Sequence, residues 1–150
     1  MQDPMRIQLI EQDPALLEAL KEACQRAEAT VLTDIPADER GLAHWQPQCD
    51  LVIAGQHPAF SDLAALNRVV WPIPLAALLP TTRPQSVMQA ARSGAVDVCN
   101  REAEAAHLAD WVGQLCARRQ DAQAKAGQND YFYSEACAKM RGLEDTIGRV

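Results

Sequence analysis

The sequence predicts an α/β domain with a doubly wound, five-stranded parallel sheet and a C-terminal helical extension. Short apolar runs alternate with amphipathic segments five times along the chain, which is typical of a parallel sheet with helices on both faces. The run 50–54 is continuously apolar, as expected for a strand covered on both sides. A length of 150 residues fits one such domain and a tail, but not two full domains.

The first strand and helix are indicated by a change of pattern near residue 13. Residues 6–10 alternate as a strand, and Asp13 can then cap a helix that Pro14 opens. The apolar face of this helix comprises Leu16, Leu17, Leu20 and Cys24. The chain therefore begins with a β-α unit.

The pattern repeats through the middle of the chain. Residues 29–33 form a short second strand, and 36–45 have a helical composition. The third strand, 50–54, ends at Gly55, and 60–69 can form the next helix. These segments predict two further β-α units.

The last two units lie between residues 72 and 119. Residues 72–79 predict a buried strand that begins with two prolines, 84–92 a helix opened by proline, and 95–99 a fifth strand. A final helix is expected from about 102 to 119. We therefore assign residues 1–119 to the domain.

Beyond the domain the composition changes. Residues 120–133 are rich in Gln, Asp and Ala and contain a strong turn signal at 127–130, which indicates a linker. Residues 134–150 recover helical spacing through Met140, Leu143 and Ile147. We expect a further helix there, the possible start of an output domain.

Composition excludes several classes of function. A net charge of -6 and a single basic pair, Arg118-Arg119, disfavour direct nucleic-acid binding. No stretch is long and apolar enough for a membrane span, and no signal peptide begins the chain, so we expect a cytoplasmic protein. The five cysteines form no metal-binding or disulfide pattern and are expected to be small buried hydrophobes.

Residues 6–119 resemble the receiver domain of two-component response regulators. The strongest local matches are 10–14, 49–53 and 91–97. The resemblance implies the strand order 2-1-3-4-5 and a phosphoryl-accepting site at the carboxyl edge of the sheet. Such a site uses acids after the first strand to hold Mg²⁺, an aspartate nucleophile after the third, a hydroxyl residue after the fourth and a lysine after the fifth.

The nucleophile is the decisive departure from this pattern. Its position falls on Gly55, and neither neighbour is an acid if the alignment shifts by one residue. A phosphoaspartate cannot form without the aspartate. We therefore interpret the chain as a pseudo-receiver, without enzymatic activity, bound metal or cofactor.

The other site positions are altered too. The acidic pair aligns with Glu11 and Gln12, with Asp13 adjacent, so one carboxylate is replaced by an amide. The hydroxyl position falls on Leu79 and the lysine position on Arg101. His57 could be proposed as a substitute phosphoacceptor, but a solvated loop histidine is the favoured interpretation because no activating partner is visible.

The C-terminal segment carries a second resemblance. Residues 137–150 are similar to the stretch that opens the ATPase domain of NtrC-type, sigma-54-dependent activators, through Met140, Arg141, Leu143, Ile147, Arg149 and Val150. An ordinary amphipathic helix would show similar spacing. The resemblance implies the regulatory domain of a larger transcription activator.

Three functions follow as hypotheses. The first is a phosphorylation-independent regulatory domain of a bacterial transcription regulator, a homodimer controlled by a regulatory protein or small ligand. The second is a pseudo-receiver like that of AmiR-type antiterminators, controlled by a partner protein, and the third is a flavodoxin-like ligand-binding domain. A dimer seam could use Leu108, Trp111, Val112 and Leu115, although covering of the sheet is the favoured interpretation for most of these residues.

Overall fold

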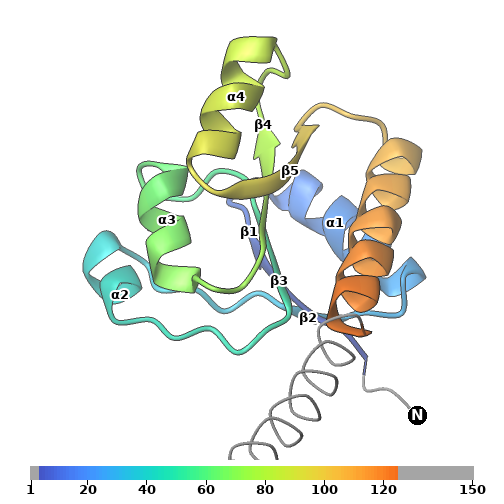
Figure 1. Cartoon of the computed structure of the whole chain (residues 1–150), viewed down its shortest axis with the longest axis horizontal. Coiled ribbons are helices and arrows are strands. Elements are labelled where there is room, and N and C mark those ends of the chain that lie inside the picture. Colours follow the sequence, from blue (N-terminus) through green and yellow to red (C-terminus); the bar gives the residue numbers. More distant parts are fainter. Residues whose placement is uncertain (1–3, 125–150) are drawn as a thin grey trace, which may run out of the picture. The chain divides into compact units, whose positions relative to one another are not determined.

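The computed structural model describes residues 4–124 (Figure 1). By its internal contacts the chain divides into two units, the first of which ends at Cys116. Five parallel strands form one sheet in the order β2-β1-β3-β4-β5, which confirms the predicted fold. The strands are β1 (Arg6–Ile10), β2 (Thr30–Leu32), β3 (Leu51–Ala54), β4 (Leu75–Leu79) and β5 (Ala95–Asn100). The helices are α1 (Pro14–Arg26), α2 (Glu39–Ala43), α3 (Leu63–Val70) and α4 (Pro84–Arg92), followed by a helix over 105–124.

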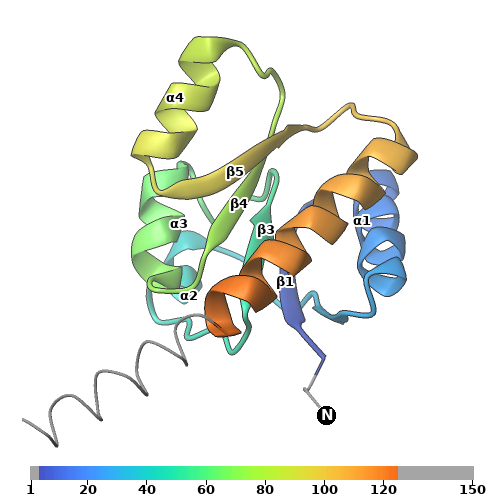
Figure 2. The ribbon, with the colours of Figure 1, turned by 45° about the vertical axis from the view of Figure 1, so that its right-hand side comes forward.

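Helices cover both faces of the sheet, and each face has its own apolar core. Figure 2 shows the sheet between the helices. One core joins α1 and residues 105–116 to the sheet, while the other joins α2 and α3 to it. β3 contributes to both cores because its side chains are buried on both faces. Its continuous apolar sequence is the consequence of this central position.

Aspartates begin three of the helices. Asp13 accepts a hydrogen bond from the backbone N–H of Ala15 at 3.1 Å, with Pro14 in the first turn, as the sequence predicted. Asp38 caps α2, and Asp62 caps α3 by accepting from the N–H of Ala65 at 2.7 Å. These caps start α2 and α3 three residues later than the sequence pattern indicated.

Two other boundaries differ from the predicted ones. β4 begins at Leu75 rather than residue 72, because neither Pro72 nor Pro74 has an N–H to donate to a ladder. The last described helix begins at 105 rather than 102, after a turn in which the Glu102 N–H donates to Asn100 Oδ1 at 2.8 Å. This helix continues to 124 and so includes the first residues of the predicted linker.

The four residues considered for a dimer seam belong to the core. Leu108, Trp111, Val112 and Leu115 pack in the core with α1, and between 0% and 6% of each is exposed. Their apolar spacing reflects the covering of the sheet, which the sequence favoured for most of them, and little of their surface is left for a partner.

The cysteines of the described region are buried, as expected. Cys24, Cys49, Cys99 and Cys116 are all free thiols in apolar surroundings. Burial raises the pKa of Cys24 to about 12, and the nearby Cys116 contributes in the same direction. These thiols are therefore packing residues rather than reactive groups. Cys137 lies outside the described residues.

Candidate functional site

The carboxyl ends of β1, β3, β4 and β5 bring the predicted site residues together. Glu11 follows β1, Gly55 follows β3, Leu79 ends β4 and Arg101 follows β5. Backbone hydrogen bonds fix these neighbours, from Gly55 N–H to the Ile10 carbonyl at 2.7 Å and from Arg101 N–H to the Leu79 carbonyl at 2.9 Å. The parallel register thus assembles one cluster from residues up to 90 positions apart.

An ion pair between Glu11 and Arg101 occupies the centre of this cluster. Arg101 Nη2 donates to Glu11 Oε1 at 2.8 Å, and Nη1 pairs with Oε2, so the contact is bidentate. The Glu11 side chain is 0% exposed and that of Arg101 13% exposed. The pair is therefore shielded from solvent and links the ends of β1 and β5.

Backbone donors complete the environment of the Glu11 carboxylate. The N–H groups of Gln12 and Asp13 donate to Oε1 at 3.1 and 3.0 Å, and the Gln56 N–H donates to Oε2 at 3.1 Å. With the two guanidinium contacts, five donors converge on two oxygens. A buried carboxylate is tolerated because all of these groups satisfy it.

This arrangement sets the ionisation of both partners. Burial raises the pKa of Glu11, but the Arg101 hydrogen bond, the backbone donors and the guanidinium charge together hold that pKa below its usual value. The hydrogen bond to Glu11 raises the pKa of Arg101. Both groups are charged at neutral pH.

Gly55 has no room for a side chain. A Cβ built on its backbone would overlap Glu11 Oε2 and would lie 2.6 Å from Arg101 Nη1. The ion pair therefore occupies the volume into which a nucleophile at this position would extend. The absence of a side chain at Gly55 and the placement of Glu11 are linked by geometry, a relation that the sequence alone did not reveal.

The donor set does not fit Mg²⁺. Glu11 directs both oxygens to hydrogen-bond donors, Gln12 is an amide, and Gly55 offers no side-chain ligand. Asp13 is exposed and caps α1. Within residues 4–124 no group of three His, Cys, Asp or Glu side chains is arranged to hold a metal ion.

Leu79 and His57 also lie at the carboxyl edge of the sheet. Both line a cavity of about 400 Å³ beside Gly55. His57 Nδ1 accepts a hydrogen bond from the Ala59 N–H at 3.0 Å, so its lone pair stabilises the loop backbone. The nearby Thr81 Oγ1 accepts from the Arg83 N–H at 3.3 Å. The hydrogen bonds of His57 and Thr81 thus stabilise the backbone of their loops.

Solved structures with the same fold are receiver domains. A putative response regulator from Chloroflexus aurantiacus is 18% identical, with a TM-score of 0.61 over 77% of this chain and 99% of that one. The receiver domain of a signal transduction histidine kinase from Syntrophus aciditrophicus is 22% identical, with a TM-score of 0.58 over 75% and 90%. That of sensor histidine kinase PA1611 from Pseudomonas aeruginosa, which has magnesium in its active-site cleft, is 14% identical, with a TM-score of 0.57 over 77% and 99%.

The similarity lies in the fold rather than in the sequence. No protein-family model matches the sequence, and no curated protein matches it. The chain has the fold of a response-regulator receiver domain, with its characteristic strand order. None of the helices in residues 4–124 has the length and apolar character needed to cross a bilayer.

Proposed function

We propose that this chain is a phosphorylation-independent regulatory domain of a bacterial transcription regulator. The observation that carries the proposal is the Glu11–Arg101 ion pair, which fills the space over Gly55. In phosphoryl transfer the protein must position a nucleophile and stabilise charge on the phosphoryl oxygens. Here the cation is already neutralised by an internal carboxylate, and the nucleophile is absent.

The ion pair supports a second element of the proposal. The carboxylate of Glu11, held against the cation at the end of β5, stands over Gly55, where a receiver would place its phosphorylated aspartate. The domain would therefore hold one conformation at this edge, independent of any kinase. Its input would be a regulatory protein or a small ligand rather than a phosphoryl donor.

The test is an amide NMR spectrum of the full chain before and after addition of Mg²⁺ with beryllofluoride, which mimics a phosphoryl group on a receiver aspartate. We expect no saturable shifts at Gly55, Leu79 or Arg101. A working receiver treated in parallel shows that the reagent is active. Saturable shifts at those three amides would refute the proposal.

A variant extends the same test to the cause of inactivity. Gly55→Asp supplies the missing nucleophile but must compete with Glu11 for the same volume. We expect this variant to remain unresponsive to beryllofluoride. A full response of Gly55→Asp would contradict the role given to the ion pair, because the missing aspartate alone would then explain the inactivity.

The proposal also includes the wider context of the domain. The motif with Met140, Arg141 and Leu143 supports an NtrC-type, sigma-54-dependent activator, and it lies outside the described residues. We also propose a cytoplasmic homodimer, whose interface would use surfaces other than the buried residues considered for a seam. Sedimentation of the full chain measures the oligomeric state, and a monomer at all concentrations would contradict the dimer.

A further inference from the structure

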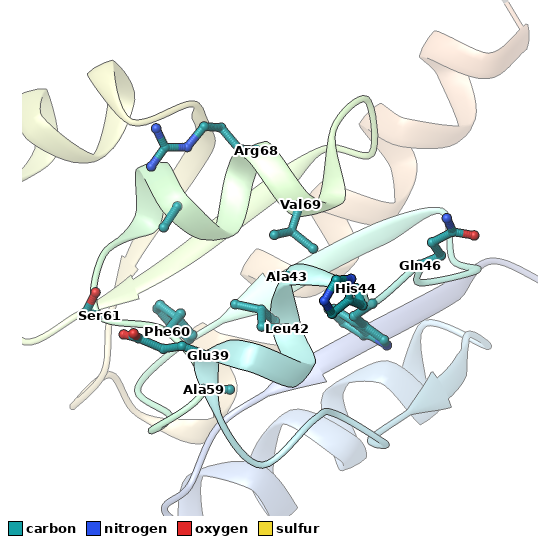
Figure 3. A pocket seen from close by; sticks show the side chains of 12 residues that line it. Glu39, Leu42, Ala43, His44, Gln46, Ala59, Phe60, Ser61, Arg68 and Val69 are labelled. Carbon is teal, nitrogen blue, oxygen red and sulfur yellow. The ribbon is translucent and has the colours of Figure 1, made fainter.

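A cavity of about 640 Å³ lies between α2 and α3, on the face of the sheet opposite α1 (Figure 3). Its size is within the range of small-molecule sites. None of the predicted site residues lines it. It was not predictable from the sequence, because its walls come from segments that pack together only in the folded domain. Figure 3 shows Leu42 and Val69 reaching into the space between the two helices.

The helix α2, which forms one wall of this cavity, is short. The helix has five residues, from Glu39 to Ala43, whereas the sequence pattern indicated ten. Trp45, Phe60 and Val69 pack against the core with part of their surface and remain half-exposed in the cavity. Two aromatic rings and a branched side chain thus offer unfilled apolar surface at one place.

The edges of the cavity carry one charge of each sign. Glu39 stands on the α2 side and Arg68 on the α3 side, and both are exposed. Among residues 4–124 neither side chain has a hydrogen bond or ion pair with another residue. Glu39 in the first turn of α2 and Arg68 in the last turn of α3 interact favourably with the helix dipoles. A helix dipole does not take the place of a side-chain partner.

We propose that this cavity binds a small apolar zwitterion, of the class of an aromatic amino acid or a dipeptide built from one. The apolar body would lie against Trp45 and Phe60, with the carboxylate toward Arg68 and the ammonium toward Glu39. A ligand of one sign only would leave one edge charge unmatched or repelled. This inference rests on the proposed function, for which it names the input.

The cavity has a direct structural connection to the degenerate site. Phe60 and Ser61 line both this cavity and the one beside Gly55. The segment that carries them begins where Gln56 donates its N–H to the Glu11 carboxylate. A ligand that displaces Phe60 can therefore alter the loop at the carboxyl edge of the sheet.

The experiment titrates the full chain with L-phenylalanine and with L-phenylalanyl-L-phenylalanine, followed by amide NMR. Saturable shifts are expected at residues 42–46 and 59–69, with the tighter compound identifying a free amino acid or a dipeptide as the better ligand. N-acetyl-L-phenylalanine lacks the ammonium and 2-phenylethylamine lacks the carboxylate. Each is expected to bind about two- to fivefold more weakly than L-phenylalanine, as for loss of an exposed ion pair.

Variants assign each charge to its partner. Arg68→Gln should bind L-phenylalanine and 2-phenylethylamine equally, while Glu39→Gln should no longer distinguish L-phenylalanine from its N-acetyl derivative. Arg92→Gln, at an exposed arginine in the last turn of α4, is the matched control and should leave the affinities unchanged. Ala65→Phe fills the cavity and should abolish binding, whereas Ala91→Phe on exposed α4 surface should not.

The outcomes separate this inference from the proposed function. Absence of saturable shifts, binding that survives Ala65→Phe, or affinities that do not respond to Glu39→Gln and Arg68→Gln would each overturn the ligand assignment. The proposed function would stand in all three cases if Mg²⁺ with beryllofluoride still produced no shifts. A thermal melt of each variant establishes that it is folded.

Discussion

Replacing Arg101 with methionine tests whether the ion pair organises the carboxyl edge of the sheet. Methionine keeps an unbranched apolar side chain but cannot donate to Glu11. The Glu11 side chain is 0% exposed, so solvent cannot take the place of the guanidinium without a change in the loops. The variant therefore leaves a buried carboxylate held by backbone N–H groups alone.

The size of the effect follows from the burial of the pair. Removing one partner of a fully buried ion pair costs about 3–5 kcal/mol, because the other charge is left uncompensated. Arg101 retains 13% exposure, and three backbone donors remain on the carboxylate. We therefore expect a lower free energy of unfolding for Arg101→Met, by about 2–3 kcal/mol at pH 7.

The cost should depend on pH with a defined sign. In the wild type the pKa of Glu11 is below its usual value of 4.5, so its ionised form contributes stability above that value, and the contribution is lost as the pH falls through the folded-state pKa. In Arg101→Met, only the backbone donors counteract the effect of burial on the pKa of Glu11, so this pKa should rise above its wild-type value. The difference between wild type and variant should therefore shrink as the pH falls below about 4.5.

Urea unfolding followed by circular dichroism at pH 7 and at lower pH measures both effects. Arg26→Met is the matched control, because Arg26 pairs with Glu22 on the exposed surface of α1, and it should cost less than about 0.5 kcal/mol. The double variant Glu11→Gln/Arg101→Met should be more stable than Arg101→Met, since no charge is then left buried. A cost for Arg101→Met equal to that of Arg26→Met at every pH would refute the reasoning.

Further substitutions at Gly55, Gly94, Gly113 and Trp111 test particular packing features, each by urea unfolding. Gly55→Ala should destabilise the domain by about 1–3 kcal/mol because its Cβ overlaps the ion pair, and a neutral effect would contradict this overlap. Gly94→Ala should destabilise the domain by about 1–2 kcal/mol, since Gly94 has a φ of 105° and a Cβ there would overlap Asn67. Gly113 lies in a helix with open space around it, so Gly113→Ala should stabilise the domain by about 0.5–1 kcal/mol. Trp111→Phe should lower the free energy of unfolding by less than about 1.5 kcal/mol, because the buried indole N–H has no hydrogen-bond partner within the described residues. Trp111→Ala should cost about 3–5 kcal/mol. An equal cost for the two variants would contradict the absence of a hydrogen bond to the indole.

Much of the fold was predictable because local pattern and burial agree. Asp13 and Pro14 determine where α1 begins, and the continuous apolar sequence of β3 indicates a central strand before any contact is known. Boundaries were less predictable where a cap competes with helical composition. Asp38 satisfies the first turn of α2, so the helix starts at Glu39 and the preceding residues lie outside it.

The sequence by itself determined that Gly55 cannot carry a phosphoryl group, because glycine has no side chain. It also determined which residues stand at the four positions to which the receiver resemblance assigns a phosphorylation site. Only the tertiary structure decided that Glu11 and Arg101 pair, since they are 90 residues apart and meet through the register of β1 and β5 across the sheet. The cavity between α2 and α3 and the burial of Leu108 and Trp111 were decided in the same way. A residue's own chemistry can be read from its identity, but its partners and exposure depend on which distant elements pack against it.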